Sequence, residues 1–238
     1  MWHCTGIESG QYSFLAVCYT GAKLMVALQK QIEKGVRILK AGGVVAFPTD
    51  TVYGLGADFS NSRAVERIYE IKKRPKYLPL PLLINDVSQA KTLAATISQL
   101  TLFLARRFWP GGLTLILPKA ASLPLYPVGQ PTVAVRVPAH RVPLALIQGL
   151  GKPIIGTSAN ISGNLSASTA GEVEQQLEDR VDFIIDGGQC PGGSKSTIVD
   201  ATGETPVILR QGIISQYEIE QAFEEYQKVN NYAYCSGL

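Results

Sequence analysis

Gly43-Val-Val-Ala-Phe-Pro-Thr-Asp-Thr-Val-Tyr-Gly-Leu-Gly-Ala-Asp58 joins a short apolar run to a loop rich in hydroxyl groups and glycine. The apolar run at 44–47 predicts a buried strand. Pro48 ends this strand because proline has no N–H to donate to a neighbouring strand. The loop that follows stands at the carboxyl end of the strand, where open α/β sheets bind their ligands. The stretch therefore predicts the lining of a site for a small polar ligand, with a tight polar turn as the alternative.

Size and composition indicate a folded domain with a substantial core. The chain has 238 residues, of which 46% are hydrophobic, and this fits one large domain or a domain with a short appendage. The net charge of +3 is too small for non-specific coating of DNA, although it leaves room for a local basic patch. No apolar run approaches the roughly 18 residues of a transmembrane helix, and residues 1–10 lack the Lys or Arg that opens a signal peptide. We therefore expect no contact with a membrane.

The cysteines and histidines form neither a metal-binding nor a disulfide pattern. The four cysteines are scattered, with no C-x-x-C and no neighbouring pair of histidines, so neither a zinc site nor a disulfide framework is expected. This cysteine usage fits a reducing compartment, and we expect a cytoplasmic protein. His3 and His140 are the only histidines, which leaves few candidates for histidine-based catalysis.

Hydrophobic periodicity divides the chain into three parts. Residues 1–22 are mixed and weakly periodic, and we expect a loose extension that folding does not need. Residues 23–214 form the expected functional domain, and 215–238 a C-terminal helix with a frayed tail. Helices are expected at 25–42, 62–74, 142–150, 169–180 and 216–226, with one or two helices within 88–109. Strands are expected at 44–47, 80–84, 113–117, 132–138, 153–156, 181–185, 197–200 and 207–210. Because the strands alternate irregularly with helices, they predict an α/β domain with a mixed sheet.

The common nucleotide-binding fingerprints are absent. Gly54-x-Gly56 has Phe59 where a dinucleotide motif needs its third glycine. The run Gly192-Gly-Ser-Lys-Ser-Thr197 is similar to a P-loop, but Ser194 separates the glycines from the lysine. A nucleotide that binds this chain must therefore be held in another way.

Basic residues cluster between Asp58 and Lys76. Arg63 and Arg67 stand beside glutamates within the predicted helix, which is typical of a solvated face with local ion pairs. Lys72, Arg74 and Lys76 instead alternate where proline ends the helix, so an extended backbone would direct their charges to one side. Such a group of cations suits a polyphosphate, and the alternative is a basic helix end that complements the helix dipole.

A second polar loop, Gly156-Thr-Ser-Ala-Asn-Ile-Ser-Gly163, follows a predicted strand. Ser158 and Asn160 stand two residues apart and could face one ligand, or they could form a turn stabilised by their own side chains. Arg136 lies in the middle of a predicted strand, where its charge needs either an acidic partner or the carboxylate of a ligand. The sequence contains no close pair of Asp or Glu residues of the kind that would indicate hydrolysis by general acid–base catalysis.

From about residue 26 to 213, these pieces together resemble the YrdC-type L-threonylcarbamoyladenylate synthases. Seven segments appear in the family's order, so coincidence is a poor explanation. They are Phe47-Pro-Thr-Asp-Thr-Val-Tyr-Gly-Leu-Gly56, Lys72-Lys-Arg-Pro75 with Pro79-Leu80, Trp109-Pro-Gly-Gly-Leu-Thr114, Val133-Ala-Val-Arg-Val-Pro138, Thr157-Ser-Ala-Asn-Ile-Ser-Gly163, Ser196-Thr-Ile-Val-Asp200 and Ile208-Leu-Arg-Gln-Gly212. The resemblance implies an α/β fold with a twisted mixed parallel/antiparallel sheet flanked by helices and a concave basic groove. It identifies 23–214 as the YrdC-like catalytic domain.

The resemblance also implies a reaction. Proteins of this family join L-threonine, bicarbonate and ATP into threonylcarbamoyl-AMP and release pyrophosphate, and a partner transferase then modifies the adenosine beside the anticodon of tRNA. Because charge crowding on the phosphates dominates the barrier, we expect Mg²⁺ to accompany ATP. Direct contact with tRNA or double-stranded RNA is left open. Longer relatives add a C-terminal domain, whereas this chain is expected to be the short form.

Roles for individual residues follow from the same resemblance. Lys72, Arg74, Ser158 and Asn160 match the catalytic tetrad of the family. Thr49, Arg136, Gly156 and Ser196 would bind threonine, with Arg136 taking its carboxylate. Lys72, Arg74, Lys76, Thr132, Ser158, Ser166 and Arg210 would bind ATP, and no protein side chain is assigned to a metal. Some members carry a histidine where this chain reads Pro81-Leu-Leu-Ile84, so a threonine contact there must be backbone or apolar.

Two other functions stay open from the sequence. The basic groove could grip structured RNA without any reaction, although no aromatic-plus-basic signature of an RNA-binding sheet is present. Carbamoyl transfer in hydrogenase maturation uses a related module, but inside a much larger chain. ATP consumption that requires both threonine and bicarbonate would separate the three functions.

Overall fold

The computed structural model describes residues 10–123 and 129–235, with side chains described over 23–123 and 129–229. The helices are α1 Gly10–Lys40, α2 Ser62–Lys72, α3 Val87–Leu93, α4 Gln99–Phe108, α5 Arg141–Leu150, α6 Ala170–Leu177, the short 3-10 helix η1 Glu178–Arg180, and α7 Gln216–Cys235. The strands are β1 Val45–Phe47, β2 Gly54–Gly56, β3 Leu82–Leu83, β4 Leu113–Pro118, β5 Thr132–Arg136, β6 Ile154–Ile155, β7 Thr157–Ser158, β8 Phe183–Ile184, β9 Thr197–Asp200 and β10 Val207–Arg210.

These strands form two mixed sheets. The order is β10-β9-β4-β5-β3-β6 in the larger sheet and β7-β2-β1-β8 in the smaller one. β4 runs parallel to β9 and antiparallel to β5, while β1 runs parallel to β8 and antiparallel to β2. The prediction of an α/β fold with mixed strand pairing is confirmed. The expectation of a single sheet is wrong. After Pro153, the chain forms β6 in the larger sheet and then β7 in the smaller sheet.

A single glycine marks the crossing between the sheets. Ile154–Ile155 pairs in the larger sheet, Thr157–Ser158 pairs in the smaller sheet, and Gly156 alone separates them. A Cβ atom at Gly156 would lie 2.2 Å from Cγ of Leu83, so no side chain fits there unless Leu83 shifts. The amide of Ile155 also donates to the carbonyl oxygen of the residue after β2 at 2.9 Å. The two sheets are therefore joined closely at this point.

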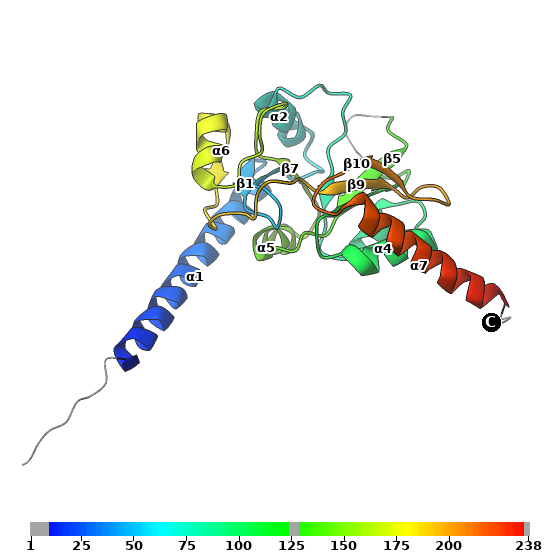
Figure 1. The fold of residues 1–238 in the computed structure, drawn as a ribbon. Helices are drawn as coiled ribbons and strands as arrows, with labels where there is room; N and C mark the ends of the chain where they lie inside the picture. Colours follow the sequence, from blue (N-terminus) through cyan, green and yellow to red (C-terminus); the bar gives the residue numbers. More distant parts are fainter. Residues whose placement is uncertain (1–9, 124–128, 236–238) are drawn as a thin grey trace, which may run out of the picture.

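Helices cover the sheets from several sides (Figure 1). α1 packs against α5 and β1, α4 against β4 and α7, and α6 against β8. α2 begins after Asn61, whose Oδ1 accepts from the amide of Ala64 at 3.2 Å. It ends at Lys72, and the capping residue Lys73 has a left-handed backbone with φ of 48°. In the described part of the chain, no helix has both the length and the apolar character that a membrane span needs.

The first and last helices are longer than the sequence predicts. α1 begins at Gly10, within the segment predicted to be loose, and 1–9 lie outside the described residues. α7 continues past the predicted end at 226 to Cys235, and only 236–238 of the expected frayed tail lie outside the described residues. Both helices extend away from the body of the molecule in Figure 1. That folding does not need residues 1–22 stays a prediction.

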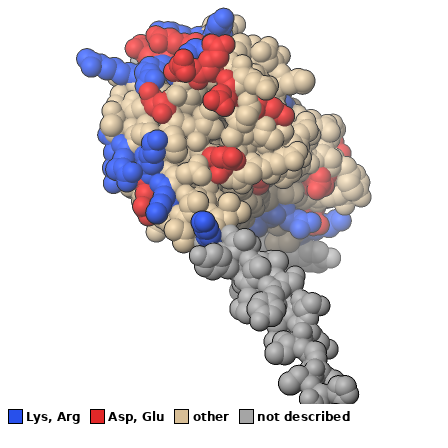
Figure 2. Space-filling view, turned by 90° about the vertical axis from the view of Figure 1, so that its left-hand side faces the viewer, with Lys and Arg blue, Asp and Glu red and all other residues tan. Residues whose placement is uncertain are grey.

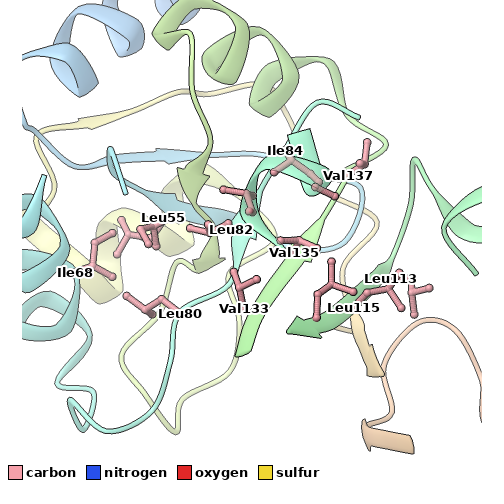
Figure 3. Packing of buried hydrophobic residues seen from close by; sticks show 14 of the residues in the cluster. Leu55, Ile68, Leu80, Leu82, Ile84, Leu113, Leu115, Val133, Val135 and Val137 are labelled. Carbon is pink, nitrogen blue, oxygen red and sulfur yellow. The ribbon is translucent and has the colours of Figure 1, made fainter. Parts of the chain in front are cut away.

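The larger of two hydrophobic clusters lies on the faces of the central strands (Figure 3). Val135 of β5 pairs in register with Leu82 of β3 on one side and Leu115 of β4 on the other, and all three side chains are fully buried. Burial of each such side chain contributes about 1.5–3 kcal/mol. A second cluster joins α1 and α5 to β1. The strands that carry polar residues at their ends are thus held by a dry core.

Asp182 connects α2 to the start of β1. Its Oδ2 accepts from the amide of Val44 at 2.6 Å and from Nη1 of Arg67 at 2.7 Å, and its Oδ1 accepts from Nη2 of Arg67 at 3.0 Å. The sequence predicts only local pairs for Arg67, but its guanidinium reaches this distant carboxylate. Partial burial acts to raise the pKa of Asp182, but the hydrogen bonds from Arg67 and Val44 outweigh it and hold the pKa below its usual value.

Replacement of this carboxylate should weaken the fold in a pH-dependent way. Asp182→Asn is expected to lower the melting temperature by about 2–4 °C at pH 7, because losing such a partly exposed pair costs about 1 kcal/mol. The folded pKa lies below the unfolded pKa, so the stabilisation is present above about pH 4 and is lost as the pH falls through the folded value. Thermal unfolding of both proteins at pH 7 and pH 3 measures this. Asp179→Asn in exposed η1 is the control, and an equal difference at both pH values would contradict the account.

Candidate functional site

A cavity of about 310 Å³ opens where the two sheets meet. Such a volume is ordinary for a small-molecule site. Its walls come from the loop after β1, the end of α2, strands β4 and β5, the loop after β7, and strands β9 and β10. Nine predicted site residues line this cavity: Thr49, Lys72, Arg74, Arg136, Gly156, Ser158, Asn160, Ser196 and Arg210. The hydroxyl-rich loops and the cations that the sequence places far apart are therefore brought together.

Three predicted ATP ligands, Lys76, Thr132 and Ser166, are not part of this lining. Nζ of Lys76 lies 3.6 Å from Oε1 of Glu66 on the surface, and Oγ of Ser166 is buried without a hydrogen-bond partner among the described residues. The predicted alternation of cations along an extended chain is wrong. Lys72 is still helical and Lys73 turns into the left-handed region, so the third cation leaves the cavity.

Lys72 holds the second polar loop in place. The side chain is only 2% exposed, and its Nζ donates to the carbonyl oxygens of Ser158 and, at 2.8 Å, Asn160. Oδ1 of Asn160 accepts a third, longer bond at 3.5 Å, and the amide of Ser162 donates to the carbonyl oxygen of Lys72 at 2.8 Å. Burial, with the nearby charges of Arg74 and Lys195, lowers the pKa of Lys72 to about 7. All three donors of its ammonium thus point at the loop.

Three further cations line the same cavity and lack an acidic partner in the described part of the chain. Arg74 donates from Nη2 to the carbonyl oxygen of Pro79 at 3.1 Å. Arg210 donates from Nε and Nη2 to the carbonyl oxygen of Ser196 at 3.2 and 2.8 Å. Burial and the charges of Arg210 and Arg74 lower the pKa of Lys195, the third member. An excess of positive charge inside a cleft raises the local concentration of anions.

Arg136 is paired with an acidic residue, the structural alternative that the sequence leaves open. Its guanidinium donates to Oδ1 of Asp50 at 2.7 Å, to Oγ1 of Thr51 at 3.1 Å and to the carbonyl oxygen of Gly111 at 2.9 Å. The Arg136 side chain is 8% exposed and that of Asp50 is 16% exposed. Three of the five N–H groups of the arginine are used, so two remain for a ligand.

Hydroxyl groups of the lining form two small networks, one beside Arg136 and one beside Arg210. Oγ1 of Thr49 lies 3.0 Å from Oγ1 of Thr51 and donates to the carbonyl oxygen of Val52 at 2.7 Å. Oγ of Ser196 lies 2.8 Å from Oγ1 of Thr114. Because hydroxyl groups both donate and accept, these networks can adapt to the polar groups of a small ligand.

Sequence reasoning missed Thr51, Thr114 and Lys195 as lining residues. The two threonines stand inside segments that the resemblance quotes, but a hydroxyl in a strand or turn gives no signal of which cavity it faces. Lys195 stands in the run 192–197, which does not match a P-loop, so the sequence assigned it no role. No other feature of the sequence marks this lysine as a lining residue.

The residues do not provide a metal site held by protein side chains. Among the described residues, no group of three or more His, Cys, Asp or Glu could hold an ion, and the cavity lining contains no carboxylate. Mg²⁺ in proteins usually takes one or two carboxylates in addition to phosphates. A magnesium ion at this site would therefore arrive as part of a phosphate-containing substrate.

Charges on the outer surface are mixed. On the face shown in Figure 2, Lys and Arg side chains form small groups with Asp and Glu side chains beside them, and most atoms belong to uncharged residues. This fits the net charge of +3. The face in this view therefore offers no broad basic surface of the kind that binds a nucleic-acid backbone.

A pocket lined by cations and hydroxyl groups between two mixed sheets is typical of α/β proteins that bind a small anionic ligand. The profile of the Sua5/YciO/YrdC family, described as "Telomere recombination", matches residues 37–212. The chain belongs to this family. The threonylcarbamoyl-AMP synthase of Pyrococcus abyssi is 42% identical over 85% of this chain, and that of Bacillus subtilis is 44% identical over 80%.

Solved structures agree with this assignment. The structure described as Pyrococcus abyssi Sua5 complexed with L-threonine matches with a TM-score of 0.77 and 44% identity over 80% of this chain. Escherichia coli YciO matches with a TM-score of 0.74 and 32% identity, and the match covers 93% of that chain. This chain spans 61% of the length of the Pyrococcus synthase and 56% of the Bacillus synthase. The resemblance found in the sequence is confirmed as family membership.

The crossing glycine offers a direct test of the site's construction. Gly156→Ala is expected to lower the melting temperature by several degrees and to reduce ligand binding, because overpacking against Leu83 costs about 1–3 kcal/mol. Gly171→Ala, at a position of α6 with open space around it, is the matched control and should leave the melting temperature unchanged or raise it slightly. Differential scanning fluorimetry of the two variants measures this. Equal melting temperatures would show that the crossing tolerates a side chain.

Proposed function

We propose that this chain makes threonylcarbamoyl-AMP from L-threonine, bicarbonate and ATP and releases pyrophosphate. One observation carries the proposal: a single cavity contains both cations without an acidic partner and an arginine surrounded by hydroxyl groups. The chain is also similar to Pyrococcus abyssi Sua5, whose structure contains L-threonine. The cations suit a triphosphate, and the arginine suits the carboxylate of an amino acid. The reaction requires both ligands side by side.

The phosphate end of the site is formed by Arg74 and Arg210. Each guanidinium is anchored to a backbone carbonyl oxygen, which leaves further N–H groups for phosphate oxygens. Lys72 acts through the loop that it holds, so that Ser158 faces the nucleotide from a fixed backbone, while the Asn160 amide bonds within the loop to Ile161 and Asn164. Positioned cations of this kind stabilise charge that develops during phosphoryl transfer.

Threonine occupies the end of the cavity near Arg136. The two free N–H groups of Arg136 take the threonine carboxylate, and the hydroxyls of Thr49 and Ser196 take its polar groups. The backbone at Gly156 allows close approach because no side chain stands there. Asp50 keeps the guanidinium oriented at 2.7 Å.

The chemistry needs no catalytic histidine or cysteine. The threonine amine and bicarbonate give a carbamate with loss of water. A carbamate oxygen then attacks the α-phosphorus of ATP, the bond from that phosphorus to the bridging oxygen breaks, and pyrophosphate leaves. The main barrier is charge crowding on phosphate, which the cations of the cavity relieve.

Several finer assignments belong to the same proposal. Lys76, Thr132 and Ser166 are assigned to the ATP side by the family resemblance. Their positions outside the cavity lining give them weaker support than Arg74 has. Mg²⁺ enters bound to ATP. The product passes to a threonylcarbamoyl transferase that acts on tRNA, and the reaction takes place in the cytoplasm.

A non-catalytic RNA-binding module is the competing function. The described residues give it little support, because the unpaired cations gather around one cavity of about 310 Å³ and the face shown in Figure 2 carries no broad basic patch. Phosphate backbones of structured RNA bind to exposed basic surfaces. The Pyrococcus and Bacillus relatives are both named threonylcarbamoyl-AMP synthase, which also favours the synthase.

A coupled assay tests the proposed function. The purified chain should release pyrophosphate from ATP only when L-threonine and bicarbonate are both present, because the attacking oxygen belongs to their carbamate. Omission of either substrate and replacement of threonine by valine are the controls. Pyrophosphate release that is independent of threonine, or RNA binding without turnover, would contradict the proposal.

Two arginine variants should separate the ends of the site. Arg74→Ala is expected to lower turnover on the order of 10²-fold, as loss of one charge-stabilising donor does elsewhere. Arg136→Lys keeps a cation beside Asp50 but removes the planar fork, so the KM for threonine should rise by at least about tenfold with a smaller change in the KM for ATP. Steady-state kinetics of both variants measure this. An unchanged threonine KM in Arg136→Lys would remove Arg136 from the threonine site.

A further inference from the structure

Lys195 is a cation of the cavity to which the family motifs assign no role. Its side chain is half-buried and lines the cavity. Among the described residues, no hydrogen bond and no ion pair involves its ammonium group. The nearest charges are those of Arg74, Arg210 and Lys72, all of the same sign. Like charges in a half-buried site destabilise the folded state unless an anion joins them.

The backbone around Lys195 is fixed, so its position is not accidental. The carbonyl oxygen of Lys195 accepts from the amide of Ile213 at 2.9 Å, and that of Ser196 accepts from Arg210 at 2.8 Å. Gly212 packs on the same peptide, where a Cβ atom would lie 2.2 Å from the carbonyl oxygen of Lys195. The lysine is therefore presented to the cavity from a rigid support.

Lys195 differs from the other cations in how many of its N–H donors are already hydrogen-bonded. The ammonium of Lys72 spends its three donors on Ser158 and Asn160. Arg74 and Arg210 each spend part of their donors on backbone carbonyl oxygens. Lys195 keeps all three N–H groups for a ligand. An ammonium with three free donors suits the non-bridging oxygens of a polyphosphate, which carry most of the charge of ATP.

We propose that Lys195 binds the pyrophosphate portion of ATP, beside Arg74 and Arg210. This inference rests on the proposed function, because it assigns a further residue to the same nucleotide site. Lys195 contacts the β- and γ-phosphates and helps pyrophosphate to leave, while Lys72 acts as a positioning residue that orients the loop. Threonine is bound without Lys195.

Calorimetric titration with inorganic pyrophosphate and with AMP tests this assignment. Lys195→Met should weaken pyrophosphate binding by about tenfold to a hundredfold, as loss of a charge-assisted hydrogen bond does, and should leave AMP binding within about threefold. Lys195→Arg should keep most of the pyrophosphate affinity. Lys91→Met removes a charge from exposed α3, outside the cavity lining, and should bind both ligands like the wild type. Since Lys195→Met relieves like-charge repulsion, its melting temperature should equal or exceed that of the wild type.

Each contrary result is distinguishable. Unchanged pyrophosphate affinity in Lys195→Met, or an equal loss of AMP and pyrophosphate affinity, would overturn the assignment. An equal loss in Lys91→Met would do the same, because it would reduce the effect to net charge. If pyrophosphate binding depends on Lys195 but the wild type releases no pyrophosphate from ATP with threonine and bicarbonate, the anion site stands and the proposed function fails.

Discussion

The rest of the site depends on the hydrogen bonds from Lys72 to the second polar loop, because they fix the place where the chain passes from one sheet to the other. At this point the chain leaves one sheet and enters the other through Gly156, where Leu83 occupies the space that a side chain would need. The ammonium of Lys72 bonds to the loop immediately beyond the crossing and fixes the end of α2 against it. Because each sheet supplies part of the cavity wall, a shift at the crossing would separate the two halves of the site.

The same arrangement places positive charge where it costs stability. The cavity lining holds five cations, Lys72, Arg74, Arg136, Lys195 and Arg210, and of these only Arg136 has an acidic partner in the described part of the chain. Burial and mutual repulsion lower the pKa of Lys72 to about 7. Natural proteins retain such unfavourable groups where a ligand compensates for them. The hydrophobic core around Val135 and the ion pair between Asp182 and Arg67 offset the stability lost through repulsion among the cations of the cavity.

The sequence predicted more of the site than of the architecture. Thr49, Arg74, Arg136 and Ser196 could be placed in one cavity because family motifs carry them in order. The division into two sheets could not be predicted, since strands of two residues have no periodicity to detect.

Local geometry accounts for the other misses. The left-handed turn at Lys73 sends Lys76 to the surface, and nothing in the alternation of basic residues reveals such a turn. The outer ends of α1 and α7 lie in stretches whose weak hydrophobic periodicity does not mark where a helix begins or ends. Lys195 was missed because it belongs to no motif, and its importance becomes visible only once its neighbours in space are known.

A crystal structure of the chain grown with ATP and L-threonine tests the central claim most directly. The account predicts that the triphosphate lies between Arg74 and Arg210 and that the threonine carboxylate lies against Arg136, both within the one cavity at the crossing of the sheets. Nucleotide bound elsewhere, for example in the groove between α1 and α5, with the crossing cavity free of ligand, would contradict it.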